Sequence, residues 1–356
     1  MTNDHSLATD ASGRINASST GADVTPPRVP HAGARDYLRL ARFDHVTKHV
    51  FILPGIALAL LLRGDQGEPL LINVLLGMLA ATCAASANYV INEWLDRDFD
   101  RHHPEKSERA AVQVALDPRV VYGFYALLAL AAIALGLMVN AGFAAVTFCF
   151  LIAGLVYNVP PLRSKDRAYL DVLSESINNP LRLMLGWAMV DPTTLPPVSV
   201  MLSFWFGGAF LMNSKRLAEF RDIVAELGQA RLALYRKSFA HYSEASLSVA
   251  NLTYALLCVM FLAVFVAKYR IEYVLLFPLV VYLFGQYYAL SLKAGSVARK
   301  PEKLFREKRL MAAAVAMAAG FMLTTAFDMP TLSLLAEQHF IDLRGSVTYP
   351  DVPAGR

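Results

Sequence analysis

The sequence predicts an all-α polytopic membrane protein with nine transmembrane helices. Of its 356 residues, 56% are hydrophobic and only 17% are charged, which is below the roughly 25% charged residues of typical soluble domains. The apolar residues also come in runs of about 20, the length that an α-helix needs to cross a bilayer. Most of these runs lack the polar stripe of a soluble amphipathic helix, so a soluble helical bundle is disfavoured.

Nine runs are long enough to be spans, and the signal is weakest for the first and the fifth. Their approximate ranges are 46–62, 71–92, 119–138, 141–158, 169–190, 197–214, 247–267, 273–292 and 310–327. All three cysteines fall inside these runs, which indicates apolar packing and no disulfide framework.

The distribution of basic residues predicts the orientation. Of the 33 Lys and Arg residues, 27 lie in the N-terminal tail and in the loops after the even-numbered spans. Cytoplasmic loops carry such an excess, so we expect a cytoplasmic N-terminus and an outside C-terminus in the cell inner membrane. The expected organisation is a disordered tail over 1–34, a transmembrane domain over 35–328 and a short extracytoplasmic tail over 329–356. The net charge of +4 follows from these loops and indicates no nucleic-acid partner.

A ladder of polar residues closes the second span. Asn92, Asp96 and Asp100 are spaced by four, so on a helix they share one face. Carboxylate and amide oxygens at a membrane surface are costly unless a cation binds them. Mg²⁺ prefers oxygen ligands and completes its coordination with waters and substrate phosphates. The ladder therefore predicts a cytoplasmic metal and phosphate site.

A second charged cluster follows the sixth span, on the same side of the membrane. Lys215, Glu219, Asp222 and Glu226 recur at spacings of three or four and so share one helix face. One interpretation is a solvated helix braced by weak ion pairs. The other is that the two clusters share metal ions and a diphosphate across the bundle, because both begin where a span reaches the cytoplasm.

Several polar residues lie inside or at the end of apolar runs. Asn178, Asn179 and Arg182 fall within the fifth span, where polar groups are expensive unless they pair or face a cavity. We expect them to line a cavity, and the alternative is hydrogen bonding between helices. Tyr157 ends the fourth span and is either an interfacial aromatic residue or a contact with the cavity.

The first cluster resembles a known family motif. The residues N-E-W-L-D-R-D-F-D-R-H-H-P-E-K-S-E-R after Ile91 are similar to the pattern N-x-x-x-D-x-x-x-D followed by H-P-x-K-x-x-R of the UbiA superfamily of intramembrane prenyltransferases. The match includes His103, Pro104, Lys106 and Arg109. The resemblance implies a nine-helix bundle with a central cavity open to the cytoplasmic side.

Within that superfamily the sequence resembles most the decaprenyl-phosphate phosphoribosyltransferase branch. The segment R-F-D-H-V-T-K around Lys48 is similar to R-P-x-x-W-x-K, and S-K-R-L-A-E around Arg216 is similar to G-K-R-x-A-E. The segments R-K-S-F-A-H-Y-S and K-P-E-K-L-F-R-E-K-R-L also look like motifs of this branch. The resemblance runs from about residue 36 to 327.

The resemblance implies Mg²⁺-dependent transfer of 5-phosphoribose from phosphoribosyl diphosphate to a polyprenyl phosphate. Asp96 and Asp100 would ligate Mg²⁺ with Asn92 alongside, and Glu219 would orient Lys215 or the sugar. Asp96, Asp100, Lys215 and Glu219 are thus the expected catalytic residues. The residues expected to hold phosphate groups are Lys48, Lys106, Arg109, Lys215 and Arg216.

The departures from the branch keep a second activity open. After Arg109 the chain reads A-A-V-Q-V, where the branch has P-I-A-x-G, and Asp222 and Glu226 form an acidic pair typical of diphosphate-prenyl sites. The alternative is therefore a prenyltransferase that moves a prenyl group from prenyl diphosphate to an aromatic or other small acceptor. A transporter is disfavoured because no inverted repeat or helix broken near mid-span is evident. A non-catalytic member of the family with a scaffolding role is the third alternative. The sequence does not predict the oligomeric state.

Overall fold

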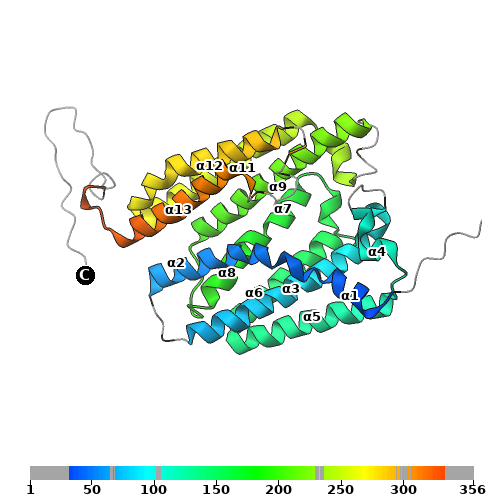
Figure 1. Ribbon diagram of the computed structural model, residues 1–356. Helices are drawn as coiled ribbons and strands as arrows, with labels where there is room; N and C mark the ends of the chain where they lie inside the picture. The colour runs from blue at the N-terminus through cyan, green and yellow to red at the C-terminus, as the bar shows by residue number, and fades with distance from the viewer. Residues whose placement is uncertain are drawn as a thin grey trace, which may run out of the picture.

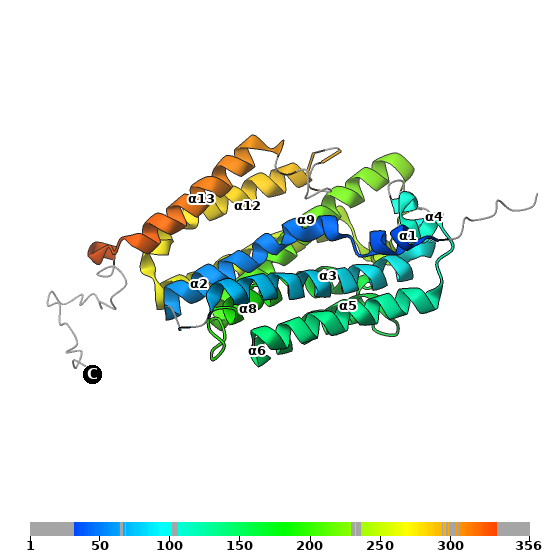
Figure 2. The same ribbon diagram turned by 60° about the horizontal axis from the view of Figure 1, so that its bottom comes forward.

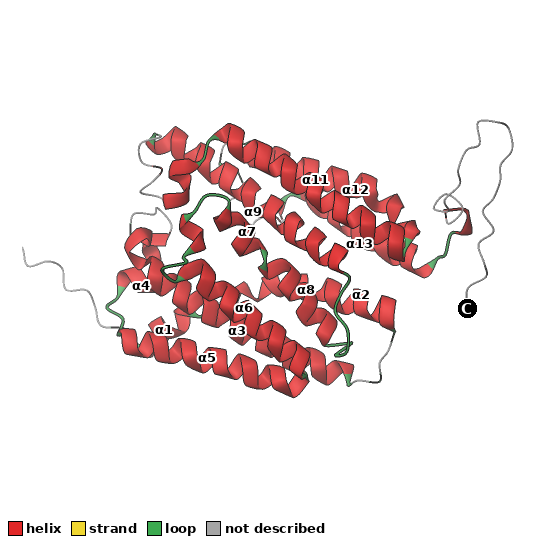
Figure 3. Cartoon of the chain, turned by 180° about the vertical axis from the view of Figure 1, so that it is seen from behind, coloured by secondary structure: helices red, strands yellow, loops and turns green. Residues whose placement is uncertain are grey.

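The computed structural model describes residues 32–332, except 65, 66, 68, 102–105, 229–231, 233–235, 294, 297, 299–303 and 305. Within this part of the chain every regular element is a helix (Figure 3). The α-helices are α1 (Ala34–Leu40), α2 (Leu53–Arg63), α3 (Leu70–Asp100), α4 (Ala110–Gln113), α5 (Pro118–Val139), α6 (Ala141–Asn158), α7 (Leu170–Ser176), α8 (Asn178–Ala188), α9 (Val198–Leu227), α11 (Glu244–Tyr269), α12 (Phe277–Ser291) and α13 (Lys308–Ala326). The 3-10 helices are η1 (Phe43–Ile52), η2 (Lys106–Glu108), η3 (Ser164–Asp166), η5 (Lys237–His241) and η6 (Ile271–Leu276).

The long helices run roughly side by side in one bundle (Figures 1 and 2). One side is formed by α2, α3, α5, α6 and α8, and within it α3 packs against both α5 and α6. The other side contains α11, α12 and α13, with α11 packed along α9. Helices α7 and α9 lie between the two sides and contact each other. The bundle therefore contains α3, which carries the polar ladder, and α7 and α9 from the middle of the chain.

Six helical segments are long and apolar enough to cross a membrane. They are Leu70–Asp100, Pro118–Val139, Ala141–Asn158, Glu244–Tyr269, Ile271–Ser291 and Lys308–Ala326. These segments correspond to six of the nine predicted spans. The other three predicted spans, like the central cavity and its opening, stay predictions.

Those three predicted spans are built differently from the rest. The run 46–62 is divided between η1 and α2, with Pro54 in the first turn of α2, where its missing N–H costs nothing. The run 169–190 is divided at Ile177 between α7 and α8, so the expectation that no helix is broken near mid-span is wrong for this run. Pro180 cannot donate to the carbonyl of Ser176, which explains this break. The run 197–214 is the first half of α9, which continues to Leu227 and carries the second charged cluster as a helical extension.

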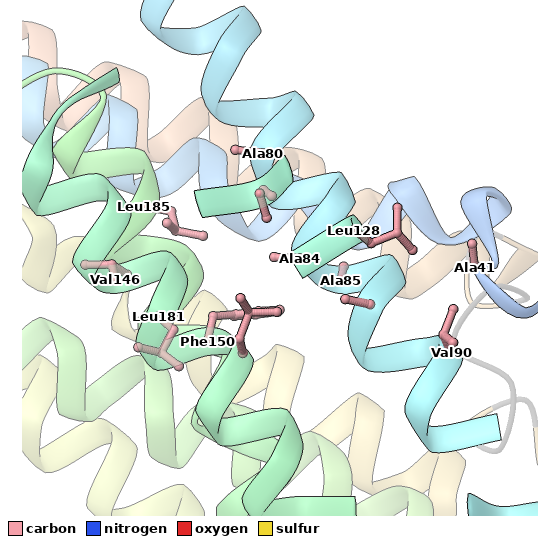
Figure 4. Close-up of a cluster of buried hydrophobic side chains, with 14 of the residues drawn as sticks. Ala41, Ala80, Ala84, Ala85, Val90, Leu128, Val146, Phe150, Leu181 and Leu185 are labelled. Carbon is pink, nitrogen blue, oxygen red and sulfur yellow. The ribbon is translucent and has the colours of Figure 1, made fainter. Parts of the chain in front are cut away.

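A core of small residues on α3 allows neighbouring helices to approach closely. Ala80, Ala84 and Ala87 are fully buried, and Figure 4 shows Ala80, Ala84 and Ala85 in one cluster with Phe150 of α6 and Leu185 of α8. Small side chains are typical of helix contacts in membranes, where close packing replaces the hydrophobic driving force. This packing fixes α3, and hence its polar end, against α6 and α8.

Two glycines allow α2 and α8 to cross in backbone contact. A Cβ atom added to Gly55 would overlap the carbonyl oxygen of Leu183, and one added to Gly186 would overlap that of Ile52. We expect Gly55→Ala or Gly186→Ala to destabilise the protein by about 1–3 kcal/mol, because backbone must move to make room. Thermal unfolding in detergent measures this loss. The matched control is Gly123→Ala on α5, where nothing lies within 4 Å of the added atom, and equal effects at the three sites would contradict the prediction.

Candidate active site

The ladder on α3 lies on one helix face, as its spacing predicts. The Nδ2 atom of Asn92 is 3.4 Å from Oδ2 of Asp96 and 2.5 Å from Oδ1 of Asn158 on α6. Asp100, one turn further, is buried with 3% exposure. Asp98 instead is exposed and pairs with Arg97 and Arg101 at 3.9 Å. The end of α3 therefore turns the ladder inward and Asp98 outward.

Asp96 is held by two basic residues of the loop after α6. Its Oδ1 atom lies 2.6 Å from Nζ of Lys165 and 2.8 Å from Nη2 of Arg163. Lys165 also donates to Oδ1 of Asn158 at 2.7 Å. Both are among the loop residues whose excess of basic side chains predicts the orientation, and the sequence did not predict their place at the ladder. Their position a few residues after Tyr157 and Asn158, at the end of a predicted span, was the available signal.

Asp100 is held by the basic residues that follow α3. Its Oδ2 atom accepts from Nη1 of Arg109 at 2.6 Å, and its Oδ1 lies 3.8 Å from Nζ of Lys106. Burial lowers the pKa of Lys106 to about 8, against the opposing effect of Asp100, and burial lowers the pKa of Lys165 to about 8 in the same way. Both ammonium groups remain mostly protonated at pH 7, so each carboxylate of the ladder faces a cation.

The second cluster is centred on a buried arginine. Arg216 of α9 is 3% exposed. Its guanidinium contacts Glu219 at 2.8 Å and both Asp171 and Glu175 at 3.3 Å. Lys215 is less constrained, with Nζ 3.9 Å from Glu219. A phosphate contact of Arg216 would replace one of three carboxylates, whereas Lys215 is free to turn toward a ligand.

Asp171 is a fully buried hub that sequence reasoning did not find. Its carboxylate accepts from Tyr242 at 2.5 Å, from Ser238 at 3.1 Å and from Arg216 at 3.3 Å, and it lies 3.5 Å from Nε of Arg236. Burial raises the pKa of Tyr242 well above its ordinary value, and Asp171 adds to this, so Tyr242 remains a neutral donor. The missed signal was a pair of acids four residues apart, Asp171 and Glu175, inside a predicted span.

Tyr157 joins the second cluster through its hydroxyl group. Its hydroxyl donates to Oε2 of Glu175 and accepts from Nη2 of Arg236, each at 2.8 Å. The next residue, Asn158, bonds to the ladder through Asn92. The end of α6 therefore connects the two clusters through adjacent residues.

Electrostatic contacts also bring the two motifs together. Lys106, which follows the first motif, and Glu219 of the second act on each other electrostatically. Lys48 acts in the same way on Lys215, and its Nζ lies 5.4 Å from the ring centre of Tyr89 on α3. These interactions place Lys48, Lys106 and Lys215 near the two acidic clusters.

The other candidates take different positions. Asn179 lies against α9, where a Cβ on Gly208 would overlap its amide. Asp222 accepts from the backbone N–H of Gly295 at 3.1 Å, which ties α9 to the loop after α12. The motif residues His103, Pro104, Pro301 and Glu302 lie outside the described residues.

The residues at the ladder fit a divalent cation that is shared with a ligand. Among the described residues no group of three or more His, Cys, Asp or Glu side chains is arranged to hold a metal by itself. Asp96 and Asp100 supply hard oxygen atoms, and Asn92 adds an amide. Such a set suits Mg²⁺, which usually takes one or two carboxylates and fills its octahedron with waters and phosphate oxygens. The surrounding Lys and Arg side chains suit those phosphates.

The fold and the site define a class of protein: an integral membrane enzyme with an acidic and basic site at one end of its helical bundle. Residues 51–314 match the model of the UbiA prenyltransferase family. The chain therefore belongs to the UbiA prenyltransferase family, and it is a membrane-bound transferase. The family expected from the motifs is confirmed.

Two curated relatives carry different activities in their names. A 4-hydroxybenzoate octaprenyltransferase of Aeromonas hydrophila is 32% identical over 121 residues, which are 34% of this chain and 42% of that protein. A decaprenyl-phosphate phosphoribosyltransferase of Mycolicibacterium smegmatis is 28% identical over 170 residues, which are 46% of this chain and 48% of that protein. The chain thus spans less than half the length of these relatives.

Solved structures confirm the fold. The structure of a UbiA homologue from Archaeoglobus fulgidus bound to GPP and Mg²⁺ matches with a TM-score of 0.62 and 20% identity over 82% of this chain and all of that chain. A structure of the same homologue bound to Cd²⁺ matches with a TM-score of 0.58 and 19% identity, with the same coverage of both chains. At these identities the likeness establishes the all-helical architecture of this chain.

Proposed function

We propose that this protein transfers 5-phosphoribose from phosphoribosyl diphosphate to a polyprenyl phosphate, with Mg²⁺ as cofactor. The observation that carries the proposal is the excess of positive charge at the site. Among the described residues, eight basic side chains surround six carboxylates. The basic residues are Lys48, Lys106, Arg109, Arg163, Lys165, Lys215, Arg216 and Arg236, and the acidic residues are Asp96, Asp100, Asp166, Asp171, Glu175 and Glu219.

This excess matches a donor with more than one phosphate group. Phosphoribosyl diphosphate carries a 5-phosphate as well as its diphosphate, whereas a prenyl diphosphate carries only the diphosphate. In the proposed site the diphosphate binds at the ladder, near Lys106, Arg109 and Lys165. Lys215 and Lys48, which lie in the same region, would bind the 5-phosphate. Arg216 is the least available of these cations, because three carboxylates already hold it.

In the proposed reaction a phosphate oxygen of the lipid attacks the anomeric carbon of the ribose. The new C–O bond forms as the bond from that carbon to the diphosphate breaks, and the electron pair leaves with the diphosphate. Bound Mg²⁺ would supply charge neutralisation on the leaving group. Lys106, Lys165 and Arg109 stabilise the same developing negative charge through fixed donors. Asn158 and Asn92 orient Lys165 and Asp96 through the hydrogen bonds described above.

The second candidate is transfer of a prenyl group to an aromatic or other small acceptor. It is favoured by the relative named 4-hydroxybenzoate octaprenyltransferase and by the homologue structure that contains GPP. The mechanism would use the same ladder and diphosphate contacts. It would leave Lys48 and Lys215 without a second phosphate to bind.

A paired assay separates the two candidates. The purified protein in detergent with Mg²⁺ receives either labelled phosphoribosyl diphosphate with a polyprenyl phosphate or labelled prenyl diphosphate with a hydroxybenzoic acid. We expect label to reach the lipid fraction in the first assay, and the second to give no product above that of the Asp96→Asn variant. Product in the second assay alone would overturn the proposal in favour of prenyl transfer.

A further inference from the structure

Three polar side chains that take no part in the ion pairs carry buried atoms without a hydrogen-bond partner. Arg182 is 9% exposed and its Nε has no hydrogen-bond partner; His49 is 4% exposed and its Nδ1 has none. The Oδ1 atom of Asn178 is also buried without a partner. Buried polar groups are rarely left unbonded, because an unbonded group loses its hydrogen bonds to water and gains none in the protein. Three such atoms in one place indicate a site for a polar ligand.

The three side chains belong to one cluster. Asn178 and Arg182 are four residues apart on α8 and share a face of that helix. Helix α8 packs against η1, which carries His49. The charge of Arg182 acts on His49. The cluster therefore joins α8 to η1.

This cluster lies deeper in the bundle than the ladder. The Arg182 guanidinium stacks 5.2 Å from the ring centre of Phe150 on α6, a residue of the apolar cluster in Figure 4. Phe150 precedes Asn158, which bonds to the ladder, by eight residues on the same helix, or roughly 12 Å along its axis. Arg182 also interacts electrostatically with Tyr89, which precedes Asp96 by seven residues on α3. The residues that contact Arg182 on α6 and α3 therefore lie about two helical turns from the ladder along each of these helices.

The hydrogen bonds within the cluster decide which of its atoms can donate and which can accept. Thr82 donates its hydroxyl to the carbonyl of Met78 at 2.8 Å, so its oxygen accepts from Nε2 of His49 at 3.2 Å. Nδ1 of neutral His49 is then an acceptor. Arg182 offers a cationic donor, and within the described chain no carboxylate lies within ion-pair distance of it. An anionic oxygen satisfies Arg182, and an acid O–H satisfies His49.

We propose that Arg182, with His49 and Asn178, binds the acidic group of the acceptor substrate. This inference rests on the proposed function, in that the acceptor is an acid. The monoanion of a phosphate monoester supplies both the negative oxygen that Arg182 binds and the P–O–H that donates to His49, whereas a carboxylate supplies only the negative oxygen. The donor diphosphate has its own cations at the ladder. The reacting carbon then lies between the two anion sites, with the apolar core around Phe150 next to the deeper one.

A binding experiment without turnover tests this inference. Binding to purified protein in detergent is measured for a short polyprenyl phosphate and the polyprenol of equal length, and for hydroxybenzoic acid and its methyl ester. We expect wild-type protein to prefer the acidic member of at least one pair by about 10-fold or more, and Arg182→Gln to abolish that preference, because a charged hydrogen bond contributes about 1.5–3 kcal/mol. Arg182→Lys should keep part of it.

The controls separate this site from the donor site. Arg101→Gln removes an exposed cytoplasmic arginine and should leave the preference unchanged. Affinity for phosphoribosyl diphosphate and for prenyl diphosphate should change by less than about 3-fold in Arg182→Gln. If that variant does not fold, His49→Gln keeps a donor toward Thr82 but removes Nδ1, and it should lower affinity for the phosphate but not for the polyprenol.

Equal wild-type affinity for the acidic and neutral members of both pairs would overturn the inference. So would an equal loss of donor and acceptor affinity in Arg182→Gln. An acid preference that depends on Arg182, found without phosphoribosyl transfer in the paired assay, would overturn the proposed function and leave this inference standing. The pair that shows the preference also identifies whether the acid is a lipid phosphate or an aromatic carboxylate.

Discussion

Asp96→Asn is expected to lower kcat/KM by at least about 100-fold, equivalent to about 2.7 kcal/mol of barrier. The substitution keeps the volume of the side chain and a carbonyl oxygen for hydrogen bonding. It removes the negative charge that faces Lys165 and Arg163 at 2.6 and 2.8 Å and one of the two carboxylates that would hold Mg²⁺. The measurement is the initial rate with the active substrate pair over a range of Mg²⁺ concentrations.

The matched control for this prediction is Asp98→Asn. Asp98 lies on the same helix two residues away, but its side chain is 65% exposed and its ion pairs are at 3.9 Å. Exposed pairs of this kind contribute little, so we expect an activity close to that of wild type. Equal rates for Asp96→Asn and wild type, in protein that is folded to the same extent, would exclude the ladder from catalysis.

Asp171→Asn is expected to destabilise the fold by about 3–5 kcal/mol, because it leaves the buried Arg216 and the partly buried Arg236 without their shared carboxylate. Arg216 and Arg236 approach Asp171 at 3.3 and 3.5 Å, and Ser238 and Tyr242 donate to the same group. A loss of this size should lower the Tm by roughly 5–15 °C. Thermal unfolding in detergent, followed by tryptophan fluorescence, measures it. Trp205 is a suitable probe because its Nε1 donates to the carbonyl of Leu173 on α7 at 2.9 Å.

Glu244→Gln is the control variant for the loss of stability expected in Asp171→Asn. It removes one partner of the exposed ion pair with Arg221, whose contribution should be below about 1 kcal/mol. A Tm of Asp171→Asn within a degree of wild type, together with lost activity, would contradict the structural role. That result would instead make Asp171 a direct substrate contact.

Local patterns predicted most of the architecture. Hydropathy located the six helices that are long and apolar enough to cross a membrane, because the length of an apolar run depends only on neighbouring residues. It could not show that the run 169–190 is divided at Ile177 between α7 and α8, since this break depends on one proline within an otherwise apolar run. It also treated 197–214 as a unit, whereas α9 continues to Leu227.

The candidate site was predicted in part. The spacing of Asn92, Asp96 and Asp100 was sufficient to place them on one face. The contacts of Arg163 and Lys165 with Asp96 were not predicted, because nothing in the sequence around these two residues shows that their loop folds back onto α3. The role of Asp171 as a hub was missed for the same reason.

By itself the sequence determined the class of protein, its family and the ladder, because apolar run length and four-residue spacing are local properties of a helix. Only the tertiary structure decided which charges meet. Asp171 is 45 residues from Arg216 and 71 from Tyr242, and Asp96 is 67 from Arg163. Contacts at such separations depend on how α3, α6, α7 and α9 pack, and a buried charge is stable only where that packing supplies a partner.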